Sequence, residues 1–438
     1  MTTKFTNTRR NDNAEIGIIG MGEMGRLYAK YISTAGWRVN ACDKPENFEK
    51  LRKEYSESSI NILENGHLVS RRSDYVIYSV EAEHIDSIVQ RYAPSTKIGA
   101  IAGGQTSCKT PEITAFEKYL PNDVDIVSCH SLHGPSIDPK GESLVVIKHR
   151  ASEKNFNLAK EILSCLGSEM VFLSAREHDR ITADTQAATH AAFLSMGVAW
   201  QANDQFPWEV SRYAGGIENI KINITMRLFS NKWHVYAGVA IMNPSAREQI
   251  KQYAKSVTEL FKLMTEGKSQ EFGDRIRSAG KAVFRDATQS MLLLDEVLDK
   301  FSLGRVPSEG NLPNSHLSLL AMVDCWWKMG IVPYNHMICS TPLFRLWLGT
   351  TEYLFRQPKL LEECINVAMN DTTFRSDDLE FTFAARGWSD CVAFADFESY
   401  RKRFEVIQNY FEPRFPEAIQ VGNEMIRTIF AMTHSESS

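Results

Sequence analysis

Short apolar runs alternate with amphipathic stretches over the first part of the chain. Between residues 15 and 174 the apolar runs have the length and composition of buried strands. Segments with helical periodicity, such as residues 24–35, lie between the earlier runs. Strands that alternate with helices predict a parallel, doubly wound sheet. The expected strands are 15–19, 39–42, 75–80, 98–102, 125–128, 144–147 and 170–173.

The pattern changes after about residue 175. Long stretches rich in Ala, Leu, Met and Glu then carry the period of a helix, with few strand-like alternations. The segments 181–202, 249–264 and 284–300 are expected to be helices. Residues 303–313 hold two glycines and two prolines, and we expect them to lead into another helical region that ends near residue 430.

The helical part repeats itself at an offset of 126 residues. The matches need no gap over about forty residues, and they include histidine, proline and tryptophan, which are scarce residues. We therefore expect a diverged tandem duplication, with copies near 175–302 and 310–430 and helices in the same order in both. The matched pairs are His190 with His316, Leu194 with Leu320, Met196 with Met322, Trp200 with Trp326, Pro207 with Pro333, Leu228 with Leu354 and Phe229 with Phe355.

Composition narrows the class of protein. The chain has 438 residues, which at about 150 residues per domain suggests about three domains. Its 43% hydrophobic and 24% charged residues are typical of a globular protein. The net charge of -5 argues against a nucleic-acid binder, which needs a basic excess. No apolar run is long enough to span a bilayer, so no membrane partner is expected.

The cysteines and the N-terminal stretch indicate a cytoplasmic protein. The stretch MTTKFTNTRRNDNAEIG lacks the apolar core of a secretory signal. The eight cysteines form no CxxC pair, and no Cys/His group has the spacing of zinc ligands. Scattered single cysteines are typical of reduced, partly buried thiols. We therefore expect a cytoplasmic protein without a metal site.

A glycine motif opens the first domain. The sequence EIGIIGMGEMGRLYAKYISTAGWRV contains G-x-G-x-x-G directly after a strand and at the start of a helix. The first glycine permits the tight turn, the second lets the backbone approach a pyrophosphate, and the third lets helix and strand pack closely. A dinucleotide is therefore expected at this loop and the helix N-terminus. The loop residues are Gly20, Met21, Gly22, Glu23, Met24 and Gly25.

The residues after the second strand leave the choice of dinucleotide open. Asp43 lies 18 residues past Gly25, where a carboxylate binds the ribose 2′-hydroxyl of NAD and would repel a 2′-phosphate. Lys44 follows it, and Arg26 and Arg38 lie in the same unit, so a basic side chain could pair with the 2′-phosphate of NADP. We expect both Asp43 and Lys44 to contact the cofactor, whether it is NAD or NADP.

Two loops further along the chain carry reactive side chains. The segment GGQTSCKTPE follows the fourth strand, and VSCHSLHGPSIDPKG comes after it. Loops at the carboxyl ends of strands line the ligand crevice of a doubly wound fold. Ser107, Lys109, His130 and His133 all fall in such loops. Their combination beside a dinucleotide site indicates an active site rather than isolated surface residues.

With these segments in place, the sequence resembles the prephenate dehydrogenases of tyrosine biosynthesis, in particular their longer fungal form. Ser131 stands where the family's H-P-x-x-G has its proline, a departure that concerns loop shape more than chemistry. Together the matching motifs span residues 15 to about 265. They are GMGEMG, the S-x-K of Ser107–Lys109, the H-x-x-x-G-P of His130–Pro135, EHDRITADTQAATH at 177–190 and RLFSNKWHVYAG at 227–238.

The resemblance implies oxidative decarboxylation of prephenate to 4-hydroxyphenylpyruvate, with NADP as the cofactor. His130 matches the family's catalytic histidine, which accepts the proton of the C4 hydroxyl, and Ser107 would orient that imidazole. Lys109 matches a lysine that stabilises the bound dianion. His190 matches a second, substrate-side histidine, and Arg227 matches the arginine that grips a substrate carboxylate.

The residues of the helical part also have alternative roles. His190 lies in an Ala-rich helix, where a buried structural histidine is plausible. Arg227 sits in the apolar run ITMRLF, so its charge needs a partner, either a protein carboxylate or the substrate. Trp233 and Tyr236 could line the pocket or belong to the core.

The expected fold is therefore α/β plus all-α. Residues 14–174 form a Rossmann dinucleotide-binding domain, residues 175–302 a helical substrate domain, and residues 310–430 a diverged second copy of it. The second copy keeps His316 but has Tyr353 in place of the arginine, so we expect it to be structural. Shorter family members pair their helical domains between two subunits. The second copy could take the partner's place, which predicts a monomer or a looser homodimer.

Three alternative functions stay open. Arogenate carries an amine where prephenate has a keto group, and the sequence does not decide between these substrates. Another Rossmann-type hydroxyacid dehydrogenase would need a lysine base on the first long helix after the sheet, and residues 181–202 contain no lysine. A cofactor-binding sensor without catalysis is disfavoured, because Ser107, Lys109, His130 and Arg227 are all present.

Overall fold

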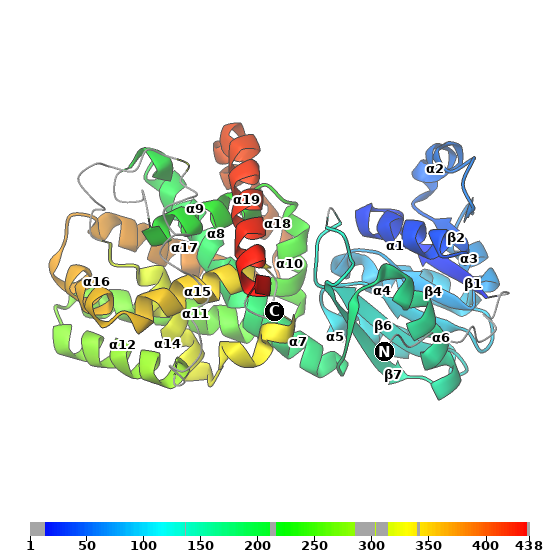
Figure 1. Ribbon diagram of the computed structural model, residues 1–438, viewed down its shortest axis with the longest axis horizontal. Helices are drawn as coiled ribbons and strands as arrows, with labels where there is room; N and C mark the ends of the chain where they lie inside the picture. The colour runs from blue at the N-terminus through cyan, green and yellow to red at the C-terminus, as the bar shows by residue number, and fades with distance from the viewer. Residues whose placement is uncertain are drawn as a thin grey trace. The chain divides into compact units, whose positions relative to one another are not determined.

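The chain divides into two compact units, Met1–Asp179 and Arg180–Ser438 (Figure 1). The sheet lies in the first unit, and the second unit is built of helices. The predicted class, α/β followed by all-α, is confirmed. The computed structural model describes residues 14–135, 137–210, 216–284, 303, 314–339 and 342–435. Apart from residues 284 and 303, the helix predicted over 284–300 and the break predicted over 303–313 lie outside this description.

The first unit is built around one eight-stranded sheet with the order β3-β2-β1-β4-β5-β6-β7-β8. Its first six strands have the order of a dinucleotide-binding fold. The strands are β1 Glu15–Ile19, β2 Arg38–Cys42, β3 Ile60–Ile62, β4 Tyr75–Tyr78, β5 Ile101–Gly104, β6 Asp125–Ser131, β7 Ser143–Arg150 and β8 Glu169–Phe172. The helices are α1 Glu23–Thr34, α2 Phe48–Glu54, α3 Gly66–Arg72, α4 Ile85–Tyr92, α5 Lys109–Tyr119, α6 Glu153–Leu163 and α7 Ala175–Thr182, which leads into the second unit.

Two strands differ from the prediction. The sequence pattern does not predict β3, which is only three residues long. The prediction of a wholly parallel sheet is wrong at β7, which runs antiparallel to β6, whereas the other neighbouring strands are parallel. The described residues between β6 and β7 contain no helix. A parallel return needs a longer crossover connection, so the short link between these strands gives an antiparallel pair.

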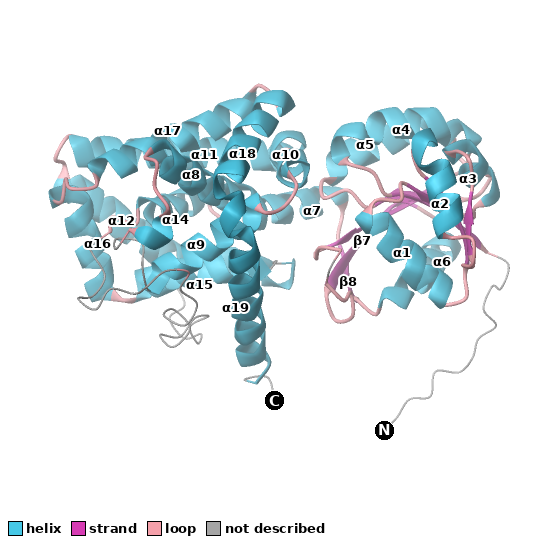
Figure 2. Ribbon diagram, turned by 90° about the horizontal axis from the view of Figure 1, so that it is seen from above, coloured by secondary structure: helices cyan, strands magenta, loops and turns pink. Residues whose placement is uncertain are grey.

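Helices cover both faces of this sheet. On one face, α1 and α6 contribute Ile32 and Ile162 to a buried cluster, and on the other α4 and α5 contribute Val89 and Phe116. Figure 2 shows the sheet between these two layers. Because both faces are buried, the strands are almost continuously apolar, which is the pattern that predicted them. The loops at the strand ends are therefore the places where polar chemistry can be exposed.

The second unit consists of eleven described helices after α7. A π-helical turn, Ala183–Ala187, joins α7 to the first of them, so the helix predicted over 181–202 is confirmed with a wider turn inside it. Within the residues that the structure describes, none of the helices has the length and hydropathy to cross a bilayer. The helices are α8 Ala188–Ala202, α9 Gly216–Phe229, α10 Trp233–Met242, α11 Pro244–Thr265, α12 Ser269–Val283, α14 Leu317–Met329, α15 Pro342–Arg356, α16 Pro358–Asn370, α17 Arg375–Ala393, α18 Phe397–Phe411 and α19 Phe415–Ser435.

The order of these helices follows the 126-residue offset. A shift of 126 residues places α8, α9, α10, α11 and α12 on α14, α15, α16, α17 and α18, with each boundary within five residues. The packing is exchanged in the same way, because α11 packs on α14 while α17 packs on α8, and α9 packs directly against α15. A reciprocal pattern of this kind is the pattern of a two-fold axis. The duplication stays a prediction, and this helix order supports it.

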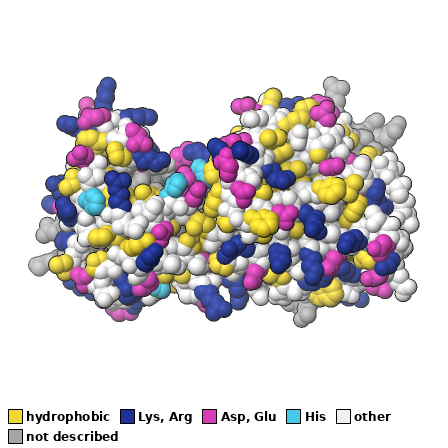
Figure 3. All heavy atoms as spheres, turned by 180° about the vertical axis from the view of Figure 1, so that it is seen from behind, with side chains coloured by type: hydrophobic (Ala, Val, Ile, Leu, Met, Phe, Trp, Pro, Cys, Tyr) yellow, Lys and Arg dark blue, Asp and Glu magenta, His cyan; other side chains and the backbone are white. Residues whose placement is uncertain are grey.

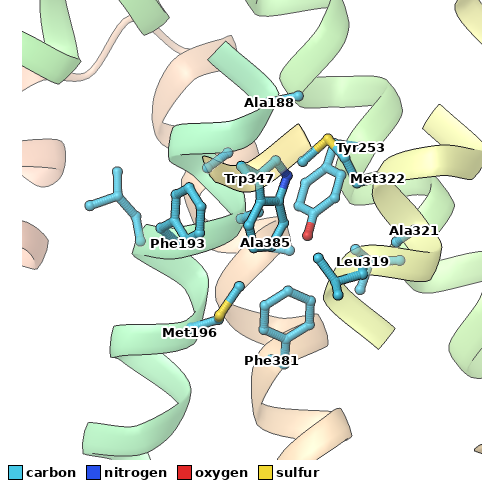
Figure 4. Close-up of a cluster of buried hydrophobic side chains, with 14 of the residues drawn as sticks. Ala188, Phe193, Met196, Tyr253, Leu319, Ala321, Met322, Trp347, Phe381 and Ala385 are labelled. Carbon is cyan, nitrogen blue, oxygen red and sulfur yellow. The ribbon is translucent and has the colours of Figure 1, made fainter. Parts of the chain in front are cut away.

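One hydrophobic core runs through the second unit and draws on helices from both predicted copies. Phe193 of α8 meets Trp347 of α15 edge to face, with ring centroids 4.2 Å apart. Tyr253 of α11 donates a hydrogen bond to the carbonyl oxygen of Ser318 on α14 at 3.2 Å. Figure 4 shows Phe193, Tyr253, Trp347 and Phe381 converging from four helices. Each predicted copy therefore buries its apolar side against the other.

Charges of both signs are interspersed on the surface. On the face drawn in Figure 3, lysine and arginine side chains lie among aspartates and glutamates. Several of them pair across helices, as Arg277 of α12 does with Glu362 of α16 at 2.7 Å. A mixed surface of this kind is consistent with the small net charge of -5.

Candidate active site

The G-x-G-x-x-G loop joins β1 to α1. Gly20 has a φ of 105°, and a Cβ on it would meet the carbonyl oxygen of Ser79 at 2.2 Å. A Cβ on Gly25 would meet the carbonyl oxygen of Gly20 at 2.0 Å. A Cβ on Gly22 would meet nothing within 4 Å, so the backbone there is open to a ligand. The three glycines thus fit the turn, the packing and the open backbone that a pyrophosphate cradle requires.

Asp43 supports this loop from the end of β2. One carboxylate oxygen accepts the backbone N–H of Met21, and the other accepts the N–H of Lys44 and the side-chain amide of Asn47, both at 2.8 Å. The carboxylate is therefore engaged with the protein, while the Lys44 side chain is exposed. Arg26 donates to the carbonyl oxygen of Met21 at 2.9 Å, which adds a second tie to the loop.

A surface hollow of about 770 Å³ lies along α1. Glu23, Arg26 and Lys30 of this helix are among the residues that line it. In the adjoining loop Met21 is buried and Met24 is half-buried. The hollow therefore offers two basic side chains beside the glycine loop, which suits the phosphates of a dinucleotide.

The candidate reactive groups of the first unit lie at the carboxyl ends of β5 and β6. His130 is the last residue but one of β6 and is 9% exposed. Ser107 lies in the bend before α5 and is half-buried. Its hydroxyl has no hydrogen-bond partner among the described residues. The expected contact between Ser107 and His130 therefore stays a prediction.

Lys109 is completely buried at the start of α5. Its Nζ donates to the carbonyl oxygens of Cys129 at 2.7 Å and Gly104 at 3.2 Å, and to Oε1 of Glu112 at 2.9 Å. An ammonium group has three protons, and all three point at protein acceptors. The geometry ties α5 to the ends of β5 and β6, and the expected contact of Lys109 with the substrate stays a prediction.

His130 makes a close contact that the sequence analysis missed. Its Nδ1 lies 2.8 Å from Nε2 of His178, and Nδ1 of His178 lies 2.9 Å from Oδ1 of Asp179. His178 and Asp179 are 1% and 3% exposed. Both belong to the EHDR segment that carried part of the family resemblance. A histidine and an aspartate adjacent to each other were the available signal, but their contact with β6 depends on the fold.

Burial controls the charge of these groups. It lowers the pKa of His130 well below its ordinary value, and repulsion from His178 and Lys109 adds to the effect. Burial also lowers the pKa of His178, although Asp179 acts against this. For Asp179, burial raises the pKa, but hydrogen bonds from His178, Lys109 and Thr110 outweigh it and leave the pKa below its usual range. The favoured state is thus two neutral imidazoles beside one carboxylate.

The candidate residues of the second unit converge around Tyr236. His190 of α8 meets the Tyr236 ring edge to face, with centroids 5.0 Å apart. Both residues line a cavity of about 280 Å³ together with Trp388 and Tyr400 of the second predicted copy. Burial lowers the pKa of His190 to about 4, so this imidazole is neutral at pH 7. A neutral histidine can donate one hydrogen bond and accept another.

Arg227 lies in the last turn of α9 and is half-buried. Its Nη1 donates to Oδ1 of Asn423 at 2.7 Å, and burial lowers its pKa. Asn231 links it to the histidine cavity, because the Asn231 amide donates to the Arg227 carbonyl oxygen at 2.9 Å and to the Tyr236 hydroxyl at 3.0 Å. Among the residues that the structure describes, no carboxylate lies within ion-pair distance of this guanidinium. Its charge is therefore available to an anionic ligand.

Two family models match the sequence. Residues 187–431 match a family described as a 6-phosphogluconate dehydrogenase C-terminal domain, and this match covers more than half of the chain. Residues 15–100 match the family described as NADP oxidoreductase coenzyme F420-dependent.

Curated relatives match over nearly the whole chain. The probable prephenate dehydrogenase, NADP(+), of Schizosaccharomyces pombe is 61% identical over 94% of this chain and 96% of its own length. The prephenate dehydrogenase, NADP(+), of Saccharomyces cerevisiae is 54% identical over 97% of this chain and 95% of its own length. A crystal structure of prephenate dehydrogenase from A. aeolicus, in complex with hydroxyphenyl propionate and NAD+, matches with 19% identity and a TM-score of 0.45 over 59% of this chain and 93% of that chain.

Proposed function

The chain belongs to the prephenate dehydrogenase family, and we propose that it converts prephenate to 4-hydroxyphenylpyruvate and CO2 with NADP, a step of L-tyrosine biosynthesis. The observation that carries this proposal is the identity of 61% and 54% with two relatives named for the activity, over nearly the full length of each. The site geometry supports it, because it supplies a neutral imidazole for proton transfer and a guanidinium for a carboxylate.

The reaction needs one proton acceptor and little other covalent help from the protein. Hydride leaves C4 of the ring while the proton of the C4 hydroxyl moves to Nε2 of His130. The ring carboxylate then leaves as CO2, its bonding electrons make the ring aromatic, and the oxygen takes a proton back as the phenol forms. Since aromatisation drives the reaction, the main tasks of the residues are to position the substrate and to hold the proton.

NADP is the cofactor of this reaction, and it supplies the hydride acceptor when bound. Gly20, Gly22 and Gly25 would hold its pyrophosphate, because the backbone at Gly22 is open. The carboxylate of Asp43 is engaged with the loop, which supports a role in shaping the site rather than in binding a 2′-hydroxyl. The exposed Lys44 would then be free to approach a 2′-phosphate.

The remaining predicted residues have separate tasks in the proposal. Ser107 would orient the C4 hydroxyl and the His130 imidazole. Arg227 would grip a substrate carboxylate, and His190 would hydrogen-bond the substrate from the helical side. Lys109 would act mainly by holding the strand ends beneath His130, since its three protons already have protein acceptors.

We also propose that the helical unit arose by duplication and that its two copies replace the paired helical domains of two subunits. The shared helix order and the reciprocal packing support this. Sedimentation should then give a monomer or a weak homodimer, and a tight dimer held by both copies would contradict it. A cytoplasmic location is proposed as well, and the seven cysteines in the described part of the chain, all with free thiols, support it.

The purified protein should form NADPH and CO2 from prephenate, with a higher kcat/KM for NADP than for NAD. Initial rates with prephenate or arogenate, each with NADP or NAD, test substrate and cofactor together. We expect the pair prephenate and NADP to give the highest kcat/KM of the four. A protein that uses arogenate better, or that reduces neither nucleotide, would overturn the proposal.

Replacing Arg227 with Ala should mainly weaken prephenate binding. A desolvated charge pair of this kind contributes about 2–5 kcal/mol, which corresponds to an increase in Kd of about 30- to 4,000-fold. Titration of the NADP-loaded variant with prephenate, followed by initial rates, would measure the effect on Kd and kcat. Arg247→Ala, at an exposed position of α11, is the matched control and should leave both values unchanged. Unaltered binding in the Arg227 variant would exclude the proposed contact.

A further inference from the structure

We propose that Asp179 and His178 fix the protons on His130 so that its Nε2 faces the substrate as a proton acceptor. His178 is a positioning residue in this scheme, because it acts through His130. The inference rests on the proposed function, in which His130 receives the proton of the C4 hydroxyl. It adds a cause for the protonation state that this step needs.

The chain of contacts begins at Asp179. Its Oδ1 accepts the backbone N–H of Lys109 at 2.7 Å, and its Oδ2 accepts the backbone N–H and the hydroxyl of Thr110, at 2.7 and 2.5 Å. Both N–H groups belong to the first turn of α5, where unsatisfied donors and the helix dipole favour an anion. Because donors surround both oxygens, Asp179 is held as a carboxylate.

That carboxylate determines which nitrogen of His178 carries the proton. Nδ1 of His178 lies 2.9 Å from Oδ1 of Asp179, and a carboxylate oxygen only accepts, so Nδ1 must be the donor. A neutral imidazole carries a proton on one nitrogen only. Nε2 of His178 is therefore left with a lone pair, and burial of the ring favours this neutral form.

The same reasoning then determines the protons of His130. Its Nδ1 lies 2.8 Å from the lone pair on Nε2 of His178, so Nδ1 of His130 carries the proton and donates it. Nε2 of His130 keeps a lone pair, and no described residue forms a hydrogen bond with it. Lys109 and His133 also act on His130, and repulsion from Lys109 adds to burial in keeping the ring neutral.

This order of protons suits the proposed reaction. When the C4 hydroxyl proton moves to Nε2, His130 becomes an imidazolium whose Nδ1–H still points at His178. The Nδ1–H of His178 points in turn at the carboxylate of Asp179, so the new charge is stabilised without a further proton transfer. Asp179 thus acts as the carboxylate of a Ser-His-Asp triad does, but through an intervening neutral imidazole.

Two variants of His178 test the scheme. In His178→Phe the ring is kept and the hydrogen bonds are lost, so the tautomer of His130 is no longer fixed. We expect kcat for prephenate to fall about 10- to 100-fold, by analogy with residues that orient metal-bound histidines, and KM to change little. In His178→Gln the side-chain oxygen can still accept from His130, so part of the lost kcat should return. His84→Gln, at an exposed position, is the control and should leave kcat unchanged.

Nitrogen NMR of histidine-labelled protein gives a measurement that needs no substrate. Wild-type His130 should carry its proton on Nδ1, and the His178→Phe variant should show a mixture of both tautomers. The His130→Asn variant assigns the signals. A wild-type His130 protonated on Nε2, or a folded His178→Phe variant with unchanged kcat, would overturn the inference. If the Phe variant does not fold, wild-type and His178→Gln spectra still decide. Absence of wild-type turnover would contradict the proposed function instead.

Discussion

Replacing His130 with Asn is expected to lower kcat for prephenate by about 10²–10⁴-fold, the range that positioned proton acceptors contribute. The asparagine amide occupies a similar place and can hydrogen-bond the C4 hydroxyl, but it cannot accept the proton as hydride leaves. Prephenate and NADP should therefore still bind. Burial at the end of β6 keeps the histidine neutral, which makes it able to act at pH 7.

Steady-state rates and direct binding of prephenate to the NADP-loaded protein would separate the two effects. His133→Asn, at a half-buried position of the loop after β6, is the control and should retain most of the activity. The sign of the pH dependence follows from the lowered pKa of His130. Wild-type kcat/KM should hold at pH 6.5 and fall at lower pH, where the imidazole becomes protonated. Unchanged turnover in His130→Asn would refute its role as the acceptor.

The sequence is sufficient to predict the parts of the fold that depend on local pattern. The strand before Gly20, the glycine spacing and the helix after it form one continuous signal, and β1 and α1 have nearly the predicted bounds. The direction of β7 could not be predicted, because an apolar run does not encode the direction in which it pairs. The offset between His190 and His316 predicted two helix series in one order, and the second unit has that order.

The candidate site depends more on tertiary contacts. A motif can identify His130 as a reactive histidine, but only the fold brings His178 within 2.8 Å of it. The arginine at 227 was expected to need an anionic partner, and the described residues around it provide only the neutral amide of Asn423. Lys109 shows the reverse case, since a lysine near a dianionic substrate looked like a ligand until its three protein acceptors were known.

The two roles considered for Lys109 predict different results when it is replaced by Met. In the structure its ammonium group is paired with Glu112, and both side chains are completely buried. Removing one partner leaves an uncompensated buried carboxylate, so the free energy of unfolding should fall by about 3–5 kcal/mol. A lysine that merely touched the substrate would instead be lost with little change in stability and a large rise in KM.

Urea unfolding followed by circular dichroism, together with prephenate kinetics on the folded fraction, distinguishes these results. Lys118→Met, at an exposed position of the same helix, is the control and should change stability by less than about 0.5 kcal/mol. The double variant Lys109→Met with Glu112→Gln removes both charges and should recover part of the lost stability, because no buried ion is then left alone. If Lys109→Met unfolds like the wild type and only its KM rises, the ammonium group serves the substrate and the buried ion pair contributes little to folding.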